Sequence, residues 1–559
     1  MTNAALIVDG LIVVVYFVTI ATIGIRVGRR ERTLEDYALG GRRIPWWAVM
    51  ASIIAAETSA ATFIGVPAEG YATRGLVYAQ VALGYVLGRA IVGRLFLRPY
   101  FEYRVYTVYD FLAIRFGPKS RASVSFLFLV MRTLASGVRL YVPSLVLVLA
   151  WRLFVRHEAV QYGTLDSWVP YAWAIGLLTL VTFVYTAIGG IRAVIWTDLV
   201  QASLMICGAL AAIVTLLCQI GGGDPLHGFT VLVRVVPEMA SRQGYFLTGL
   251  ESLPPDAGAW LSVHVLLEQK YTLPAALLGG TIVAMAAFGT DQDMVQRMLT
   301  ATDYRRGRRS LMGSALLDVP VFAAFSLIGV LLVAFYDLHP QLRPARFNDV
   351  FGAYILTGMP PVLRGFLLAG LFATAMGSLS AALNALATSM TNDWYRPHVA
   401  PDREPGHYVT AARLFTGFFA AAMILVAVAF AYANVKNPGL TIIPVVLGVA
   451  GYILGPMLGV FLLGMLTRTR GSDAGNVVAV AAGLIAVFVL SGRLGDLWNW
   501  AASPGYALAL PAWVPRIEFT WYPTIGAAVT LGIGLLFGTP ADAIEAARRA
   551  RSSNVVSHE

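Results

Sequence analysis

Charged side chains are scarce in this chain of 559 residues, since only 13% are Asp, Glu, Lys or Arg while 58% are hydrophobic. Soluble domains carry about 25% charged and about 45–50% apolar residues. The deficit excludes a cytosolic enzyme, a disordered chain and a nucleic-acid-binding protein, in spite of a net charge of +10. The basic residues stand in short clusters between long apolar runs, which is the pattern of an all-α polytopic membrane protein embedded in a lipid bilayer.

Cysteine is almost absent, and catalytic motifs are missing. The two cysteines, Cys207 and Cys218, lie about 16 Å apart along one predicted helix and cannot bridge each other. The sequence contains no metal-ligand cluster, nucleophile–base pair or phosphate loop, because its one Gly-rich stretch, Gly221–Gly223, does not join a strand to a helix. We therefore expect neither a disulfide scaffold nor an enzyme.

Apolar runs of about 18 residues or more predict thirteen membrane-spanning helices. They lie near residues 5–26, 45–72, 76–99, 122–152, 169–188, 192–219, 271–291, 311–336, 363–391, 408–433, 438–466, 474–492 and 519–538. With thirteen spans, all dense basic clusters fall on one side of the membrane: 26–43, 98–121, 297–309, 468–470 and 548–551. The positive-inside rule then predicts an integral multi-pass protein of the plasma (inner) membrane, with its N-terminus outside and its C-terminus in the cytoplasm.

The second span departs from uniform apolarity. Its middle carries polar or helix-breaking residues, namely Glu57, Thr58, Ser59, Thr62, Gly65 and Pro67. A helix broken at such a place frees backbone carbonyls, which are good ligands for a hard cation. The alternative is a Pro-kinked helix whose hydroxyls bond back to its own carbonyls.

The ninth span is rich in small and hydroxyl side chains between Thr374 and Asn384. Ser380 and Asn384 are four residues apart and therefore share one helix face. The pattern is compatible with a binding site or with close helix packing alone.

Several charges lie deep in the spans: Arg89, Arg132, Arg139, Asp198 and Asp318. Each is costly if it faces lipid, so each needs a partner or a watery cavity. Internal ion pairs of Arg89 or Arg132 with Asp318 or Glu57 would satisfy this need. Arg139 lies near the middle of its span, where a substrate is expected, and we expect Glu57 or water to hold it in the empty state.

Six stretches resemble the sodium:solute symporter family in order and spacing: 55–71, 187–201, 289–297, 375–384, 455–459 and 464–470. The resemblance implies a LeuT-like fold of two inverted five-helix repeats, at 45–219 and 271–466, in which the first helix of each repeat is broken. An extra span and a basic cytoplasmic loop (1–44) precede them, an extracellular loop (220–270) joins them, and two spans and a cytoplasmic tail (467–559) follow. It also implies sodium-driven import of a small solute.

The family's principal sodium site falls on Ala55, Thr58 and Thr374 through carbonyls and on positions 377 and 378 through hydroxyls. Here Ser378 keeps its hydroxyl, but Gly377 stands where a Ser is usual. The resemblance assigns Asp198 an electrostatic role beside this site. Ala381 lacks the hydroxyl of members that have a second site, so one sodium site is expected.

Members that carry sialic acids resemble this chain at Ser59, Thr62, Gln80 and Arg139, where the arginine would grip a substrate carboxylate. Glu57 stands where those members have a small hydroxyl, and we include it among the candidate substrate-binding residues. The seventh span has no amide in 284–288, unlike that of sugar-carrying members.

Three alternatives remain open at this point. One is proton coupling through Glu57, another is symport of a neutral sugar or an amino acid, and the third is a membrane sensor that has lost transport. The tail 541–559 holds no signalling domain, which disfavours the sensor. The sequence does not distinguish a monomer from an oligomer.

Overall fold

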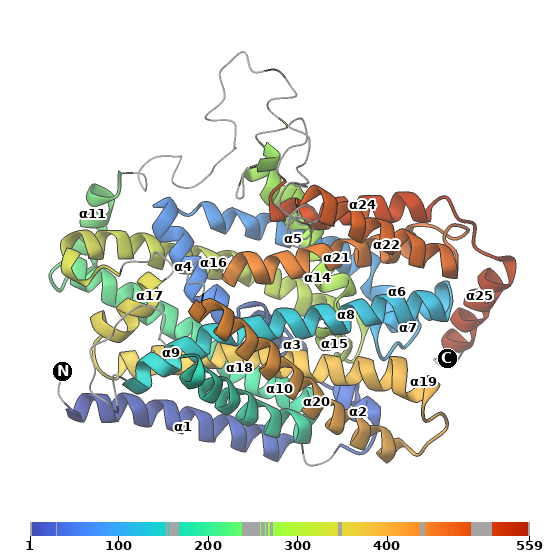
Figure 1. The fold of residues 1–559 in the computed structure, drawn as a ribbon, viewed down its shortest axis with the longest axis horizontal. Coiled ribbons are helices and arrows are strands. Elements are labelled where there is room, and N and C mark those ends of the chain that lie inside the picture. The colour runs from blue at the N-terminus through green and yellow to red at the C-terminus, as the bar shows by residue number, and fades with distance from the viewer. Residues whose placement is uncertain are drawn as a thin grey trace.

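The computed structural model describes residues 3–28, 31–152, 155, 167–237, 258, 263, 266–268, 272–344, 349–436, 442–492 and 517–556. Within these ranges the chain is helical, and extended residues form only two isolated bridges. Most long helices run along the long axis of Figure 1, where α1 begins at one end and α25 lies at the other.

The helices follow the predicted apolar runs closely. Those that match the first six runs are α1 (Asn3–Val27), α3 (Trp46–Glu57) with α4 (Ala60–Thr73), α5 (Val81–Leu95), α8 (Pro118–Arg139) with α9 (Tyr141–Trp151), and α10 (Val169–Ile220), which contains two runs. Those that match the last seven are α14 (Gly280–Thr290), α16 (Tyr304–Leu338), α18 (Leu363–Ser389), α20 (Pro405–Lys436), α21 (Ile442–Leu466), α22 (Asp473–Leu490) and α24 (Tyr522–Gly534). Shorter or peripheral helices connect them: α2 (Leu34–Leu39), α6 (Leu97–Glu102), α7 (Val108–Arg115), α11 (Pro225–Val235), α15 (Gln292–Leu299), α17 (Val350–Ala353), α19 (Arg396–His398) and α25 (Ala541–Val556).

Eight helices of the described ranges are long and apolar enough to cross a membrane, or nine if the bent pair α3–α4 is one span. The number is below thirteen because α10 counts once and because the apolar segments Ala275–Thr290 and Ala450–Leu466 and helix α24 are shorter than 18 residues. The count of thirteen, the domain boundaries and the sidedness of the termini stay predictions. Most of the predicted loop 220–270 lies outside the described residues, and its first part forms α11.

The second span is broken, as predicted, and the break lies at Thr58 and Ser59. Helices α3 and α4 meet there at an angle of 64°. The Ser59 side chain caps α4 by accepting from the amide of Thr62. Pro67 lies inside α4 and does not end it. The N-cap hydroxyl, not the proline, therefore sets the position of the break.

Helix α10 contains two predicted spans because Gly190 joins them with an abrupt kink. Gly190 has φ 48° and ψ −151°, a conformation that L-residues avoid. A Cβ at this position would lie 2.5 Å from Glu31 Oε2 and 2.6 Å from the carbonyl oxygen of Tyr37. Both the backbone angles and the neighbouring segment require a glycine.

We expect Gly190→Ala to lower the free energy of unfolding by about 1–3 kcal/mol, because it adds backbone strain and a steric clash. Thermal unfolding of the purified protein in detergent measures the effect. Gly176→Ala in the same helix is the matched control, since a Cβ there meets nothing within 4 Å. Equal melting temperatures of the two variants would contradict the requirement.

The seventh span is also broken. Helix α14 ends at Thr290, Asp291 is extended (φ −85°, ψ 118°), and α15 begins at Gln292. The Asp291 side chain caps α15 by accepting from the amide of Asp293. This corrects one expectation: Arg297 is fully buried in α15 and does not belong to an exposed cytoplasmic cluster. A polar, amphipathic turn resembles a loop in sequence, although here it packs inside the bundle.

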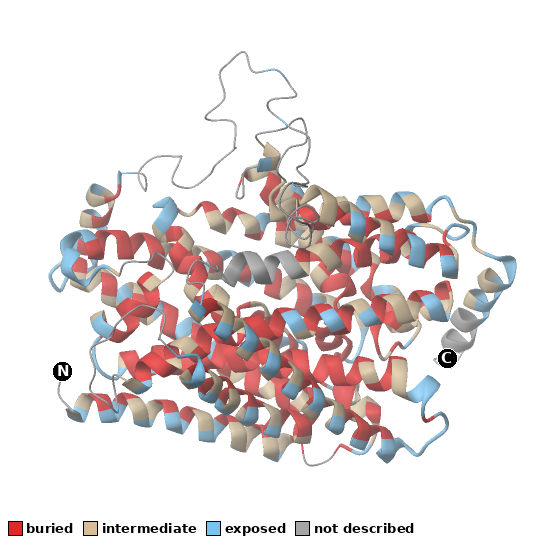
Figure 2. Cartoon of the chain, in the orientation of Figure 1, coloured by how far each residue is buried: buried red, intermediate tan, exposed pale blue. Residues whose placement is uncertain are grey.

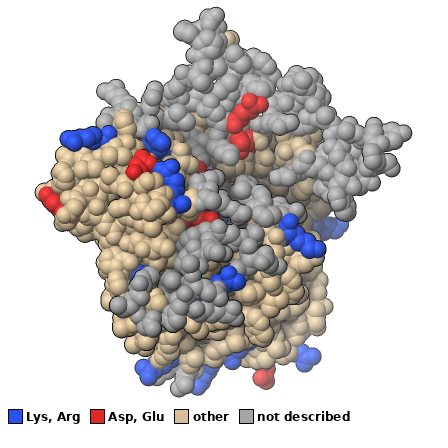
Figure 3. Space-filling view, turned by 60° about the vertical axis from the view of Figure 1, so that its left-hand side comes forward, with Lys and Arg blue, Asp and Glu red and all other residues tan. Residues whose placement is uncertain are grey.

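Buried residues gather in the middle of the bundle, and outer helices alternate exposed and buried faces (Figure 2). Helix α18 is buried along nearly its whole length. Helix α1, in contrast, exposes apolar side chains, including Ile7, Leu11 and Val18. Broad areas of the described surface in Figure 3 carry no charged side chain. Such exposed apolar faces suit contact with lipid.

Candidate functional site

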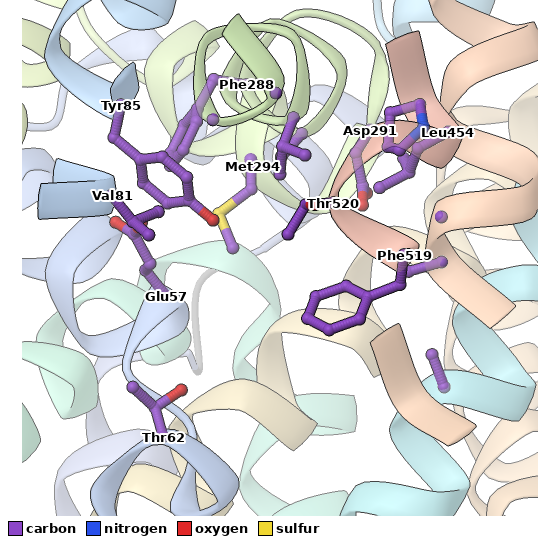
Figure 4. A pocket seen from close by; sticks show the side chains of 18 of the residues that line it. Glu57, Thr62, Val81, Tyr85, Phe288, Asp291, Met294, Leu454, Phe519 and Thr520 are labelled. Atoms are coloured by element: carbon purple, nitrogen blue, oxygen red, sulfur yellow. The ribbon is translucent and has the colours of Figure 1, made fainter. Parts of the chain in front are cut away.

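A cavity of about 230 Å³ lies between the broken helix α3–α4 and the helices α5, α8, α14 and α21. Four predicted substrate residues line it, namely Glu57, Ser59, Thr62 and Arg139. In Figure 4, Glu57 and Thr62 lie on one side of the cavity, and Tyr85, Phe288 and Met294 lie on another. The wall is therefore mostly apolar with a few polar groups, as small-molecule sites usually are.

Gln80 is the exception among the predicted substrate residues. It is buried in the turn before α5 and is not in the cavity wall. Tyr78, Val81 and Tyr85 line the cavity from the same segment. Successive residues of a helix point in directions about 100° apart, so an error of one position in matching this segment to the family would assign the site to a residue that points elsewhere.

Arg139 ends α8 and lines both this cavity and a smaller adjoining one. Among the described residues it has no hydrogen bond and no ion pair, although it is attracted by Asp293 and Asp291 and repelled by Arg132. Ala60 and Ser378 line the smaller cavity with it. An arginine at this depth with a vacant fork is suited to an anionic group of a ligand.

Glu57, one of the two partners expected for Arg139 in the empty state, does not hold it. Glu57 forms an ion pair with Arg89. Arg89 also pairs with Asp318 at 2.5 Å and with no other carboxylate among the described residues. The Arg89 guanidinium lies 3.9 Å from the centre of the Phe288 ring and donates to Ser314. The predicted pairing of Arg89 with Asp318 or Glu57 is thus confirmed, and one guanidinium serves both carboxylates.

Arg132 has other partners than those expected. It pairs with Asp291 at the break of the seventh span and with Asp293 Oδ2 at 3.2 Å. The expected pairing of Arg132 with Glu57 or Asp318 is therefore wrong. The break at Asp291 and the first turn of α15 place two carboxylates beside Arg132.

The break at Thr58 and Ser59 exposes the two carbonyls assigned to the cation site. In a continuous helix, the amide of Ser59 would donate to the carbonyl of Ala55, but it donates to that of Glu57 at 3.0 Å. The amide of Thr62 would serve the carbonyl of Thr58, but it donates to Ser59 Oγ. The carbonyls of Ala55 and Thr58 therefore lack their helical donors and are available as ligands.

Helix α18, which carries Thr374 and Ser378, packs against α3, α4 and α10. Thr374 Oγ1 and Ser378 Oγ donate to carbonyls of their own helix, at 2.8 and 3.1 Å, which leaves their lone pairs free to accept. Gly377 contributes no side chain. All ligands that this candidate site could offer are oxygens, which a hard cation prefers.

Asp198 is fully buried on α10, and only one of its two carboxylate oxygens has partners among the described residues. Its Oδ2 accepts from Ser52 Oγ at 2.6 Å and lies 3.4 Å from the guanidinium of Arg297. Arg297 also pairs with Asp293 at 2.7 Å. Asp198 Oδ1 is buried without a hydrogen-bond partner.

Three residues of this cluster, Ser52, Asp293 and Arg297, were not among the sequence-based candidates, and neither was Gln201, whose side chain approaches Gly377 together with that of Asp198. Gln201 is three residues after Asp198 on α10 and therefore shares its face. That spacing is a signal by which the sequence could have pointed to Gln201.

Relatives of known function carry different solutes. The chain is 27% identical over 495 residues to a sodium/sialic acid symporter of Proteus mirabilis, covering 87% of this chain and 89% of that protein. It is also 27% identical over 509 residues to a sodium/glucose cotransporter of Vibrio parahaemolyticus, covering 86% and 85%. Both are transporters, so they agree on the activity but not on the solute.

The fold matches a solved structure of a sodium-coupled sialic acid symporter in a substrate-bound outward-open state. The TM-score is 0.75 at 23% identity, and the match covers 95% of this chain and 97% of the other. This likeness confirms the predicted LeuT-like fold. The family model of the sodium:solute symporters matches residues 37–483, more than half of the sequence. The chain therefore belongs to the sodium:solute symporter family and is a multi-pass membrane transporter coupled to sodium.

Proposed function

We propose that the protein imports a small carboxylate-bearing solute, such as a sialic-acid-like sugar acid, together with sodium. The observation that carries this proposal is Arg139, a cation on the cavity wall without an ion-pair partner in the described part of the chain. A neutral sugar would leave this guanidinium without a counter-charge, whereas any solute with a carboxylate would supply one. The relative that carries sialic acid supports the same solute class.

In this proposal, Arg139 binds the solute carboxylate, and Ser59 and Thr62 donate to its hydroxyls from the N-terminal turn of α4. Ser378 and Arg139 line one small cavity, so the ion and the solute meet at the joint between α4, α8 and α18. Occupation of both sites would hold these helices together, which is a physical route to coupling. We further propose that the protein lies in the plasma (inner) membrane with its C-terminus in the cytoplasm.

The first experiment is binding to the purified protein with sodium or choline as the cation. The panel contains a sialic acid, a neutral hexose, a zwitterionic amino acid and a short carboxylate. We expect sodium-dependent binding of the sugar acid alone. Binding of the hexose in place of the sugar acid would overturn the solute class and leave the family unaffected.

Ser378→Ala should raise the sodium concentration for half-maximal uptake several-fold, with little effect on solute recognition at saturating sodium. The reason is that Gly377 cannot supply the neighbouring hydroxyl. Uptake into proteoliposomes over a sodium series measures the effect. Ser203→Ala is the control, because the exposed Ser203 also donates to a carbonyl of its own helix. If both variants share the midpoint of the parent, Ser378 is not a sodium ligand.

Proton coupling through Glu57 is the second candidate. The specific observation in its favour is that Glu57 and Asp318 share the single guanidinium of Arg89, which leaves one excess negative charge in the protein interior. A bound proton would neutralise it. Uptake that follows a proton gradient in sodium-free buffer would favour this candidate over sodium coupling.

A further inference from the structure

Gly377 leaves the expected sodium site one hydroxyl short, but its place is not vacant. A Cβ built on Gly377 would lie 2.5 Å from Gln201 Oε1 and 3.2 Å from Asp198 Oδ1. Two side-chain oxygens from α10 therefore converge on the position where a serine side chain would stand on α18. A serine could not be added here unless Gln201 moved aside.

Neither of these oxygens has a donor among the described residues. Gln201 and Asp198 are 1% and 0% exposed, and Gln201 Oε1 and Asp198 Oδ1 are buried without a hydrogen bond. The other ends of both side chains are fixed. Gln201 Nε2 donates to the Tyr16 hydroxyl at 3.3 Å, and Asp198 Oδ2 accepts from Ser52. Buried acceptors without donors are costly, and a cation between them removes that cost.

We propose that the amide oxygen of Gln201 replaces the missing hydroxyl at position 377 and, with Asp198 Oδ1, binds the transported sodium ion. The inference rests on the sodium site proposed above and adds two side-chain ligands from α10 to the carbonyls of α3 and to Ser378. All of these ligands are oxygens, which a hard cation prefers.

The charges around the site are compatible with a cation at Asp198. Asp198, Asp291 and Asp293 pair with Arg132 and Arg297, and Arg139 attracts Asp291 and Asp293 without forming an ion pair with them. Asp198 makes its hydrogen bond and its ion pair through Oδ2, so its Oδ1 remains available to a cation. An amide oxygen adds a ligand without adding charge.

The test measures the melting temperature of the purified full-length protein in detergent against sodium chloride, with choline chloride at constant ionic strength. Sodium that binds the folded state raises the melting temperature once its concentration exceeds the dissociation constant. The concentration at which this rise sets in is called the sodium midpoint. We expect Gln201→Ala to raise the sodium midpoint at least about tenfold. Gln201→Glu keeps an oxygen in place and should stay within about threefold of the parent. Gln219→Ala, on the same helix and bonded to Gly358, is the control and should match the parent.

A rescue experiment separates ligand loss from general damage. Gly377→Ser alone should weaken sodium binding, because its side chain collides with Gln201. Combined with Gln201→Ala, the same serine should restore the midpoint of the parent, since it returns a hydroxyl to a site that now has room.

Three outcomes overturn the inference: an unchanged midpoint in Gln201→Ala, a Gln201→Glu variant as poor as Gln201→Ala, or a double variant no better than Gln201→Ala. The second outcome would mean that the amide nitrogen of Gln201 faces Asp198. If the parent itself responds equally to sodium and choline, the sodium site fails as a whole, and that result is distinct from these three.

Discussion

Arg139→Lys should weaken the binding of an acidic solute at least about tenfold, or about 1.4 kcal/mol. Lysine keeps the charge but loses the planar fork that grips both carboxylate oxygens. Arg139→Gln removes the charge as well and should cost about 2–5 kcal/mol, because the solute carboxylate would then be buried without a partner. Calorimetric titration with the sugar acid at saturating sodium measures both losses.

The solute series gives the matched control for Arg139. The methyl ester or amide of the same solute should bind poorly to the parent and be less affected by either substitution. Arg98→Lys, at a largely exposed ion pair with Glu102, should leave binding unchanged. If Arg139→Lys binds the sugar acid as the parent does, or if the true solute has no anionic group, the carboxylate clamp is wrong.

The broken second span could be predicted from sequence because its causes are local. Ser59 is a good helix N-cap, and Thr58 and Thr62 put hydroxyls around it. The intramembrane charges could also be recognised from sequence, since Arg89, Arg132 and Arg139 interrupt long apolar runs. Composition and spacing therefore located the site region, but they did not fix the contacts within it.

The ion-pair partners could not be predicted, because they depend on helices that are distant in sequence. Glu57 could reach any arginine within a helix turn or two of the cavity, and only the packing of α5 against α16 places Arg89 between Glu57 and Asp318. Arg132 meets Asp291 and Asp293, which lie at the end of the predicted seventh span and just beyond it. Arg139 is therefore left without an ion-pair partner in the described part of the chain. This is stronger support for a solute site than its depth in the membrane alone.

The replacement for the hydroxyl missing at position 377 could not be predicted from sequence either. In the sequence alone, Gly377 is a lost ligand, because a serine is usual at this position. The oxygen that stands in its place comes from Gln201 on another helix, and only the approach of α10 to α18 brings it there.

Arg89→Met should be the most destabilising of the substitutions considered, at about 3–5 kcal/mol, because it strands buried carboxylates. Arg89 is completely buried and is the shared partner of Glu57 and Asp318. We expect a large loss of folded protein, measured as the monodisperse fraction after detergent extraction and as the melting temperature. Arg98→Met, in an exposed pair, should change stability by about 1 kcal/mol or less.

The charge of the Glu57–Arg89–Asp318 cluster can be tested separately from its packing. In Glu57→Gln, Arg89 keeps Asp318 as its partner, so we expect this variant to be much more stable than Arg89→Met. Adding Glu57→Gln and Asp318→Asn to Arg89→Met removes both stranded charges and should recover most of the lost stability, since a neutral cluster can replace a buried ion pair at little cost. A triple variant no more stable than Arg89→Met would show that the loss came from the packing of the Arg89 side chain on Phe288, and not from its charge.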